Sequence, residues 1–299
     1  MKRLEGTVVM VTGSGRGFGR SMALAYGLEG AMVVCVARTI SELNGTRDMI
    51  HSSGGDAAVL RVDLAVPEEI DSLREAVKES FGGLDVLLNN AATSPWKTLD
   101  EMTVKDWDRT LDVNLRAPFL LARAFKDSMA ARGGGSIINI TSRSAEIGFV
   151  AEVGYCPSKY GLEGLTQCLA LELRPLGIAV NSLNVSAPEA RRLKPTELTL
   201  REAAEMPEEE GSRIASEEEM VAAFTDAWVF LALQRGGGVT GQRLSTKGLV
   251  EELERDGWEA MEERLMGRLT MAVYQPYDFP RKVRYQTPEG GWEELVFES

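Results

Sequence analysis

Short apolar runs alternate with longer stretches of helical periodicity along the first 185 residues. The apolar runs predict strands over 7–12, 32–37, 57–62, 85–89, 136–141 and 179–185, and the longer stretches predict helices over 17–28, 41–50, 67–81, 103–131 and 155–173. Strands that are apolar throughout indicate a sheet that is covered on both faces. Because strands and helices alternate, the strands are expected to be parallel and joined by right-handed crossovers. The pattern therefore predicts an α/β fold with a Rossmann-like, doubly wound parallel sheet and helices on both faces.

The regular pattern ends after Val185, and residues 186–220 contain prolines and two glutamate runs, which are typical of a solvated face. The elements predicted beyond it are a helix over 220–233, a strand over 241–245, an acidic helix over 250–267 and strands over 282–286 and 292–297. Residues 1–248 are expected to form a dinucleotide-binding and catalytic domain. Residues 249–299 are expected to form a C-terminal α+β extension, packed on the same or a neighbouring subunit.

The composition narrows the class of function. A net charge of −12 and a pI near 4.8 argue against nucleic acid, which requires clustered Lys and Arg. The three cysteines are too few and too irregularly spaced for a disulfide framework or a zinc site. The single histidine, His51, argues against Ser-His-acid hydrolysis and against metal sites built from several histidines. With no signal peptide or long apolar span expected, we predict a cytoplasmic protein without metal or membrane partner.

A glycine-rich turn, Thr12-Gly13-Ser14-Gly15-Arg16-Gly17-Phe18-Gly19, lies between the first strand and the first helix. Glycine allows positive φ and a close approach of the backbone to a pyrophosphate, and the helix N-terminus offers free N–H groups to it. No Gly-Lys-Ser/Thr follows, so the turn is not a Walker A motif. Taken alone, it is also compatible with a purely structural turn.

Further motifs follow the strands in a fixed order. They are Asp63-Leu64 after the third strand, Asn89-Asn90-Ala91-Ala92 after the fourth, Asn114 in the next helix, Ser142 after the fifth strand and Tyr155-x-x-x-Lys159. Together with the turn, this set resembles the short-chain dehydrogenases/reductases over about residues 7–185. One departure stands out. The family's Pro-Gly and threonine after the sixth strand are replaced here by Val185, Ser186 and Ala190.

The resemblance implies an oxidoreductase that transfers a hydride between a nicotinamide cofactor and a carbonyl or carbinol carbon. Tyr155 would exchange the hydroxyl proton, Ser142 would hold the substrate oxygen, Lys159 would bind the nicotinamide ribose, and Asn114 would support a water-linked proton path. A lysine one turn along the helix is expected to lower the pKa of the tyrosine. Without Ser142 and Asn114, the pair would be better explained as a surface tyrosine and a lysine whose stem packs on the protein while its ammonium reaches solvent.

The same resemblance assigns the cofactor site. It comprises Gly13, Ser14, Arg16, Gly17, Phe18, Gly19, Arg38, Asp63, Leu64, Asn90, Ala91, Tyr155 and Lys159. The second strand ends in Ala37-Arg38-Thr39, with no acid to hold a ribose 2′-OH, and Arg16 lies in the turn. A guanidinium suits a 2′-phosphate, which favours NADP(H), although both arginines are also compatible with surface roles.

The leading hypothesis is therefore an NADP(H)-dependent dehydrogenase or reductase acting on a secondary alcohol or ketone. The alternatives are a 3-oxoacyl-thioester reductase, with Arg191, Arg192 and Lys194 at the rim, and a nucleotide-binding sensor or scaffold without turnover. Substrate contacts are expected from Trp96, Arg143 and Phe149, with Glu146 and Glu152 facing the same pocket; Trp96 is equally compatible with packing under its loop. A homodimer or homotetramer is expected, as is common in the family.

Overall fold

A seven-stranded sheet forms the centre of the computed structural model, which describes residues 2–185, 191–192, 213–214, 216–270, 282–287 and 291–296. Its strands are β1 (Val8–Thr12), β2 (Met32–Ala37), β3 (Asp56–Arg61), β4 (Val86–Asn89), β5 (Gly135–Thr141), β6 (Ile178–Asn184) and β9 (Arg243–Ser245). All pairs are parallel, in the order β3-β2-β1-β4-β5-β6-β9. The strand order reverses between β1 and β4, which is where doubly wound sheets bind their ligands. The predicted fold class is confirmed.

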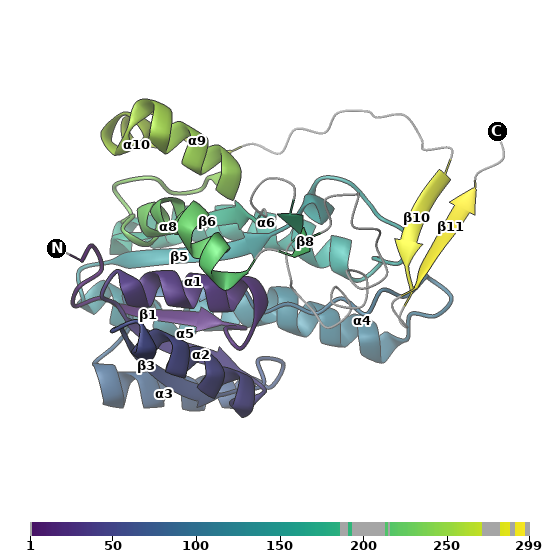
Figure 1. Cartoon of the computed structure of the whole chain (residues 1–299), viewed down its shortest axis with the longest axis horizontal. Helices are drawn as coiled ribbons and strands as arrows, with labels where there is room; N and C mark the ends of the chain where they lie inside the picture. Colours follow the sequence, from purple (N-terminus) through teal and green to yellow (C-terminus); the bar gives the residue numbers. More distant parts are fainter. Residues whose placement is uncertain are drawn as a thin grey trace.

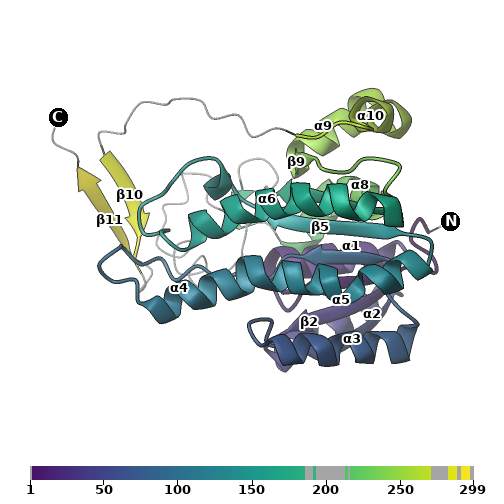
Figure 2. The ribbon, with the colours of Figure 1, turned by 180° about the vertical axis from the view of Figure 1, so that it is seen from behind.

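Helices cover both faces of this sheet (Figures 1 and 2). They are α1 (Gly17–Leu28), α2 (Ile40–Ser52), α3 (Pro67–Phe81), α4 (Val104–Leu111), the π-helical turn η1 (Asp112–Arg116), α5 (Ala117–Ala131), the 3-10 turns η2 (Arg143–Ala145) and η3 (Arg174–Leu176), α6 (Tyr155–Leu173), α8 (Glu217–Ala232), α9 (Thr246–Asp256) and α10 (Trp258–Leu265). The smaller strands are β7 (Arg191–Arg192), β8 (Arg213–Ile214), β10 (Lys282–Gln286) and β11 (Trp292–Val296). Helices α1, α2 and α8 contribute to one core, and α3, α5 and α6 to the other.

The strands divide their side chains between the two cores by simple alternation. In β1, Val9 and Val11 belong to the core under α1 and α8, whereas Val8 and Met10 belong to the core on the opposite face. Successive side chains of a strand point to opposite faces, so a strand that is buried on both must be apolar throughout. This alternation explains the continuous apolar runs in the sequence.

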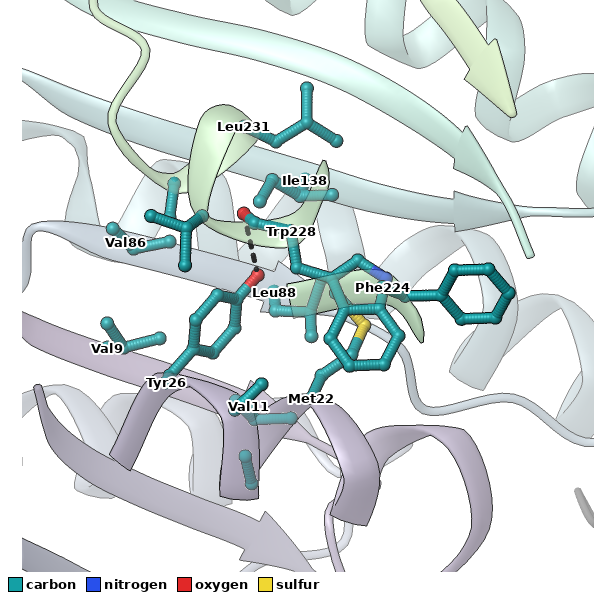
Figure 3. Packing of buried hydrophobic residues seen from close by; sticks show 14 of the residues in the cluster. Val9, Val11, Met22, Tyr26, Val86, Leu88, Ile138, Phe224, Trp228 and Leu231 are labelled. Carbon is teal, nitrogen blue, oxygen red and sulfur yellow. Dashed lines mark hydrogen bonds between the residues drawn. The ribbon is translucent and has the colours of Figure 1, made fainter. Parts of the chain in front are cut away.

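Trp228 lies at the centre of the core under α8 (Figure 3). Its ring meets Phe18 edge-on at 5.4 Å between centroids and Phe224 at 5.9 Å. The hydroxyl of Tyr26, which is fully buried, donates to the backbone carbonyl of Trp228 over 3.5 Å. Since Phe18 belongs to the glycine-rich turn, this contact packs α8 against the turn on the side of the core.

The C-terminal extension differs from its predicted form. The prediction of a single helix over 250–267 is wrong. Two helices, α9 and α10, are separated at Gly257, whose φ of +78° is in the region that favours glycine. Leu253 and Met261 are buried in the core that contains α8, and Trp258 stacks edge-on against Phe230 at 5.6 Å. The apolar face of this segment is therefore covered by its own chain. The domain boundary at residue 248 stays a prediction.

The β10–β11 pair forms an antiparallel hairpin, as the two predicted strands suggest. Both views place it beside α4, on the side of the sheet where the strands end (Figures 1 and 2). All five residues of β11 are exposed.

Candidate active site

A cleft of about 400 Å³ opens at the carboxyl ends of the parallel strands. The residues with predicted roles that line it are Gly13, Arg16, Phe18, Gly19, Arg38, Asp63, Leu64, Asn90, Ala91, Trp96, Ser142 and Tyr155. Its lining also includes Gly15, Ala37, Thr39, Glu42, Val62, Ala92, Thr93, Ser94, Arg109, Val113, Ser144 and Glu152. The structure thus brings together residues from the ends of β1 to β5 and from the start of α6.

The glycine-rich turn forms one wall of the cleft, and two of its glycines are required by packing. Gly13 has φ +67°, and a Cβ there would lie 2.9 Å from Cα of Ala91. At Gly19, a Cβ would collide with the Asn90 side chain and the Gly13 carbonyl. The first turn of α1 can therefore approach β4 closely, leaving its N-terminus at the cleft. Gly17 and Ser14 do not line the cleft; Ser14 lies buried behind the turn, where its carbonyl accepts from Thr46 over 2.8 Å.

Thr12 and Asn90 lock the ends of β1 and β4 together. The Thr12 hydroxyl accepts from the backbone N–H of Asn90 at 3.0 Å and of Ala91 at 3.1 Å. In return, Nδ2 of Asn90 donates to the carbonyls of Thr12 at 2.9 Å and Gly13 at 3.3 Å. Asn90 therefore shapes the turn through its side chain while its backbone lines the cleft.

The far end of the cleft is polar and open. Arg38 is exposed and has no ion pair among the residues that the structure describes, whereas Arg16 lies 3.7 Å from the carboxylate of Glu42. Both oxygens of Asp63 accept from Nη2 of Arg109, at 2.9 and 3.0 Å. Partial burial raises the pKa of Asp63, but the hydrogen bond and charge of Arg109 outweigh it and hold the pKa below its usual value. Asp63 thus lines the cleft as an ionised carboxylate that is paired with Arg109.

At the opposite end, Tyr155 begins α6, and its phenol and the hydroxyl of Ser142 line the same part of the cleft. Burial raises the pKa of Tyr155 well above its ordinary value, the negative charge of Glu152 raises it further, and the nearby hydroxyl of Ser142 offsets only part of this. Ser142 also accepts from the backbone N–H of Ser144 at 3.1 Å. The phenol and the serine hydroxyl are therefore held beside each other, with the phenol in its neutral form.

Lys159 lies one helical turn after Tyr155 and is almost completely buried, with 2% of its surface exposed. Its ammonium donates to the carbonyl of Ile140 at 2.7 Å and lies 5.4 Å from the centre of the Tyr155 ring. Burial lowers the pKa of Lys159 to about 8. The pKa of Tyr155 is therefore raised, and not lowered as the spacing of Tyr155 and Lys159 predicted, because burial of the phenol and the charge of Glu152 dominate.

Asn114 does not line the cleft but lies directly behind it, in the π-helical turn η1. Its side chain accepts from the Thr93 N–H at 2.8 Å and donates to the Thr93 carbonyl at 2.9 Å and to Oγ of Ser158 at 3.0 Å. A π-turn inside a helix frequently marks a functional site. Here it connects the loop after β4 to the first turn of α6.

Comparison with known proteins matches residues 7–197 to the family model described as short chain dehydrogenase. An uncharacterized oxidoreductase of Thermotoga maritima is 33% identical over 82% of this chain and 97% of its own length. The D-threitol dehydrogenase of Mycolicibacterium smegmatis is 34% identical over 61% of this chain and 70% of its own. The chain belongs to the short-chain dehydrogenase family. A solved metagenomic short-chain oxidoreductase in complex with NADP has 36% identity and a TM-score of 0.60, covering 64% of this chain and 86% of that one.

Because it belongs to the short-chain dehydrogenase family, the chain is an oxidoreductase. Its predicted substrate contacts are only partly found at the cleft. Of the three residues expected at the substrate, Trp96 lines the cleft, whereas Arg143 and Phe149 are exposed and outside its lining. Glu146 points to Arg243 instead, at 2.7 Å. Ser186 and Ala190, at the places of the family's usual glycine and threonine, lie outside the described residues.

The sequence reasoning missed three groups that complete the site of this short-chain dehydrogenase: Glu42, Arg109 and Ser144. No local signal identifies the first two, since Arg109 meets Asp63 across 46 residues of sequence. Ser144 had a signal, because it lies two residues after Ser142 in a loop. In the described part of the chain, no helix is long and apolar enough to cross a bilayer, and no group of metal-ligating side chains is found.

Proposed function

We propose that this short-chain dehydrogenase is an NADP(H)-dependent enzyme that interconverts a secondary alcohol and a ketone, with Tyr155 as the general acid and base. The observation that supports this most strongly is that the hydroxyl groups of Tyr155 and Ser142 lie near each other at the inner end of the cleft. A neutral phenol and a hydroxyl side by side offer two hydrogen bonds to a single oxygen, which is what a carbonyl needs as negative charge develops on it.

The cleft fits a dinucleotide at both ends. Gly13 and Gly19 allow the first turn of α1 to pack closely against Asn90 and Ala91, which leaves the N-terminus of α1 at the cleft, where a pyrophosphate can bind. Arg38 and Arg16 offer positive charge at the far end, where no acid follows β2 directly. A 2′-phosphate at Arg38 accounts for a guanidinium that is left without an ion pair in the described structure. These features support NADP(H) over NAD(H).

The reaction then follows from the chain's own groups. When bound, the nicotinamide supplies or accepts the hydride. In reduction, the Tyr155 hydroxyl gives its proton to the substrate oxygen while the hydroxyl of Ser142 donates a hydrogen bond to the same atom. In oxidation, the phenolate of Tyr155 takes the proton of the carbinol hydroxyl, and Ser142 keeps its hydrogen bond to the same oxygen. Lys159 and Asn114 hold the helix that presents Tyr155, and Lys159 places a buried positive charge beneath the ring.

The raised pKa of Tyr155 favours one direction at neutral pH. A phenol that keeps its proton is ready to act as an acid, so reduction of a ketone should proceed across neutral pH. Oxidation requires the phenolate, and its rate should rise as the pH increases.

The two alternatives fare differently. The basic rim expected for a thioester substrate rests on Arg191 and Arg192, whose side chains are not described, and on Lys194, which lies outside the described residues. A sensor without turnover has no need of the Tyr155–Ser142 pair. We therefore propose the dehydrogenase, acting as a cytoplasmic homodimer or homotetramer in which residues 249–299 form a C-terminal extension packed on the same or a neighbouring subunit.

A spectrophotometric screen tests the proposal. NADP⁺ is combined with a panel of secondary alcohols, and NADPH with the corresponding ketones and 3-oxoacyl thioesters, with NAD(H) in parallel. Turnover of an alcohol–ketone pair that is abolished by Tyr155→Phe supports it. Turnover of thioesters alone favours the reductase alternative, and tight binding of NADPH without any turnover favours the sensor.

A further inference from the structure

Glu152 brings a carboxylate into the cleft three residues before Tyr155. Its Oε2 accepts from the hydroxyl of Ser144 at 2.7 Å and from the thiol of Cys156 at 3.3 Å. Burial raises the pKa of Glu152, although these two hydrogen bonds oppose the change. Its other oxygen, Oε1, receives no hydrogen bond from any residue that the structure describes. The cleft therefore contains a half-buried acceptor with one side unused.

The backbone around Glu152 is held in an unfavourable conformation. Ala151 has φ +62°, and Trp96, in the loop after β4, has φ +45°. The residues that follow them, Glu152 and Lys97, pair in a parallel bridge. Positive φ at non-glycine residues persists only where the surrounding structure imposes it, and such positions cluster at ligand sites. Lys97 does not neutralise Glu152, since its ammonium pairs with Asp106 at 2.7 Å.

Glu152 lies two hydrogen bonds from the group that holds the substrate oxygen. Ser142 donates to Ser144 over 3.2 Å, and Ser144 donates to Glu152. Because Glu152 lines the same cleft as Ser142 and Tyr155, a substrate whose oxygen lies between Ser142 and Tyr155 can extend its neighbouring carbons towards the carboxylate. A hydroxyl on one of these carbons can donate to Oε1, because an ionised carboxylate only accepts. An alkyl group there would cover Oε1 without replacing its lost water.

We propose that Glu152 selects substrates that carry a hydroxyl group next to the reacting carbon, so that the site oxidises a vicinal diol or polyol and reduces an α-hydroxy ketone. This rests on the proposed dehydrogenase function. In oxidation, the carbinol C–H gives a hydride to NADP⁺, its O–H gives a proton to Tyr155, and a C=O forms. The neighbouring hydroxyl stays unchanged and only donates to Glu152.

Matched substrates that differ in one hydroxyl test this directly. The ratio of kcat/KM for 2,3-butanediol over 2-butanol is measured with NADP⁺, and that for 3-hydroxy-2-butanone over 2-butanone with NADPH. In the wild type, both ratios should be about 10 or more, as expected for a hydrogen bond to a charged group. Glu152→Leu should bring them close to 1 by lowering kcat/KM for the hydroxylated substrate, with the simple one changed by only a few fold.

Glu152→Gln keeps the size of the side chain and guards against misfolding in Glu152→Leu; it should also lower both ratios. Glu172→Gln, a substitution of an exposed carboxylate at the other end of α6, is the matched control and should change nothing. Ratios that stay unchanged in both Glu152 variants would overturn the inference, as would a wild type that prefers 2-butanol or that prefers 3-amino-2-butanol to the diol. These outcomes leave the dehydrogenase proposal intact, whereas no turnover of any alcohol or carbonyl compound overturns both.

Discussion

The two ends of the cleft treat their positive charges in opposite ways. At the open end, Arg38 is exposed to solvent, whereas at the inner end Lys159 is almost fully buried and hydrogen-bonded to a backbone carbonyl. An exposed charge is screened and can be replaced at little cost to folding, while a buried one affects both folding and chemistry. Mutations at the open end should therefore change cofactor preference, and mutations at the inner end should change catalysis, each without the other effect.

Loss of the Tyr155 hydroxyl should give the largest effect. Tyr155→Phe removes the proton donor, so kcat should fall by about 10³-fold, within the range for general acid catalysis. The dissociation constant for NADPH should change by only a few fold, because the ring and Lys159 remain. Steady-state kinetics and a fluorescence titration of NADPH measure the two quantities. Retention of most activity would remove Tyr155 from the mechanism.

Lys159→Met should lower activity and increase stability. Because burial lowers the pKa of Lys159 to about 8, the folded state bears the cost of a buried charge below that pH. The variant should therefore unfold at higher denaturant concentration, by about 1–3 kcal/mol at pH 7, after loss of the hydrogen bond to Ile140 is subtracted. It should also lose about 10²-fold in kcat.

The stability advantage of Lys159→Met over the wild type should decrease as the pH rises. As pH rises from about 8 towards the ordinary lysine pKa near 10.5, the unfolded chain holds its proton while the folded one releases it, so the wild type gains stability relative to the variant. Denaturant melts of both proteins between pH 7 and 10 measure the difference. An advantage of the variant that grows with pH would contradict the buried-charge explanation.

At the open end, Arg38→Asp should change cofactor preference without changing the fold. A carboxylate in place of the guanidinium repels a 2′-phosphate and can accept from a ribose hydroxyl, so the ratio of kcat/KM for NADPH over NADH should fall by about 10–100-fold. The free energy of unfolding should stay within about 0.5 kcal/mol of the wild type, as for most surface substitutions. A wild type that already favours NADH would refute the assignment of Arg38.

Substitution of Arg243 should have the smallest effect on kcat, because Arg243 only positions Ser142. From β9 it donates to the backbone carbonyl of Ser142 at 3.0 Å and pairs with Glu146 at 2.7 Å and Glu163 at 3.5 Å. Arg243→Ala should lower kcat by about 10-fold, because a small misplacement of a catalytic group is costly. NADPH affinity should be unchanged. Arg243→Lys keeps the charge and should recover part of the rate; equal losses in both variants would show that the charge is not what matters.

Local patterns in the sequence were sufficient for most of the fold. The bounds of β2, α1, α3 and α6 match those predicted. In α3, for example, Pro67 opens the helix and Gly82, whose φ is +73°, ends it. The π-helical turn η1 was not predicted; it interrupts a stretch of continuous helical periodicity, where Asn114 bonds to the loop after β4.

In the site, too, local motifs were predictable from the sequence, whereas properties that depend on distant contacts were not. The predicted residues of the turn and the Tyr155–Ser142 pair meet because all of them follow strand ends of one parallel sheet. The pKa of Tyr155 was beyond the reach of sequence reasoning, since it depends on how deeply α6 and the loop before it bury the phenol. Spacing along a helix gives the neighbour of a group but not its solvation.

The contact between the two ends of the chain has a consequence for protein synthesis. Arg3 donates to Asp226 at 2.6 Å and its guanidinium lies 5.6 Å above the ring of Trp258, while the core behind α1 extends from Leu4 to Met261. A ribosome releases the first of these residues long before the last. The part of this core that α8, α9 and α10 complete therefore stays open until these helices have emerged, and the apolar surface exposed meanwhile is prone to aggregation.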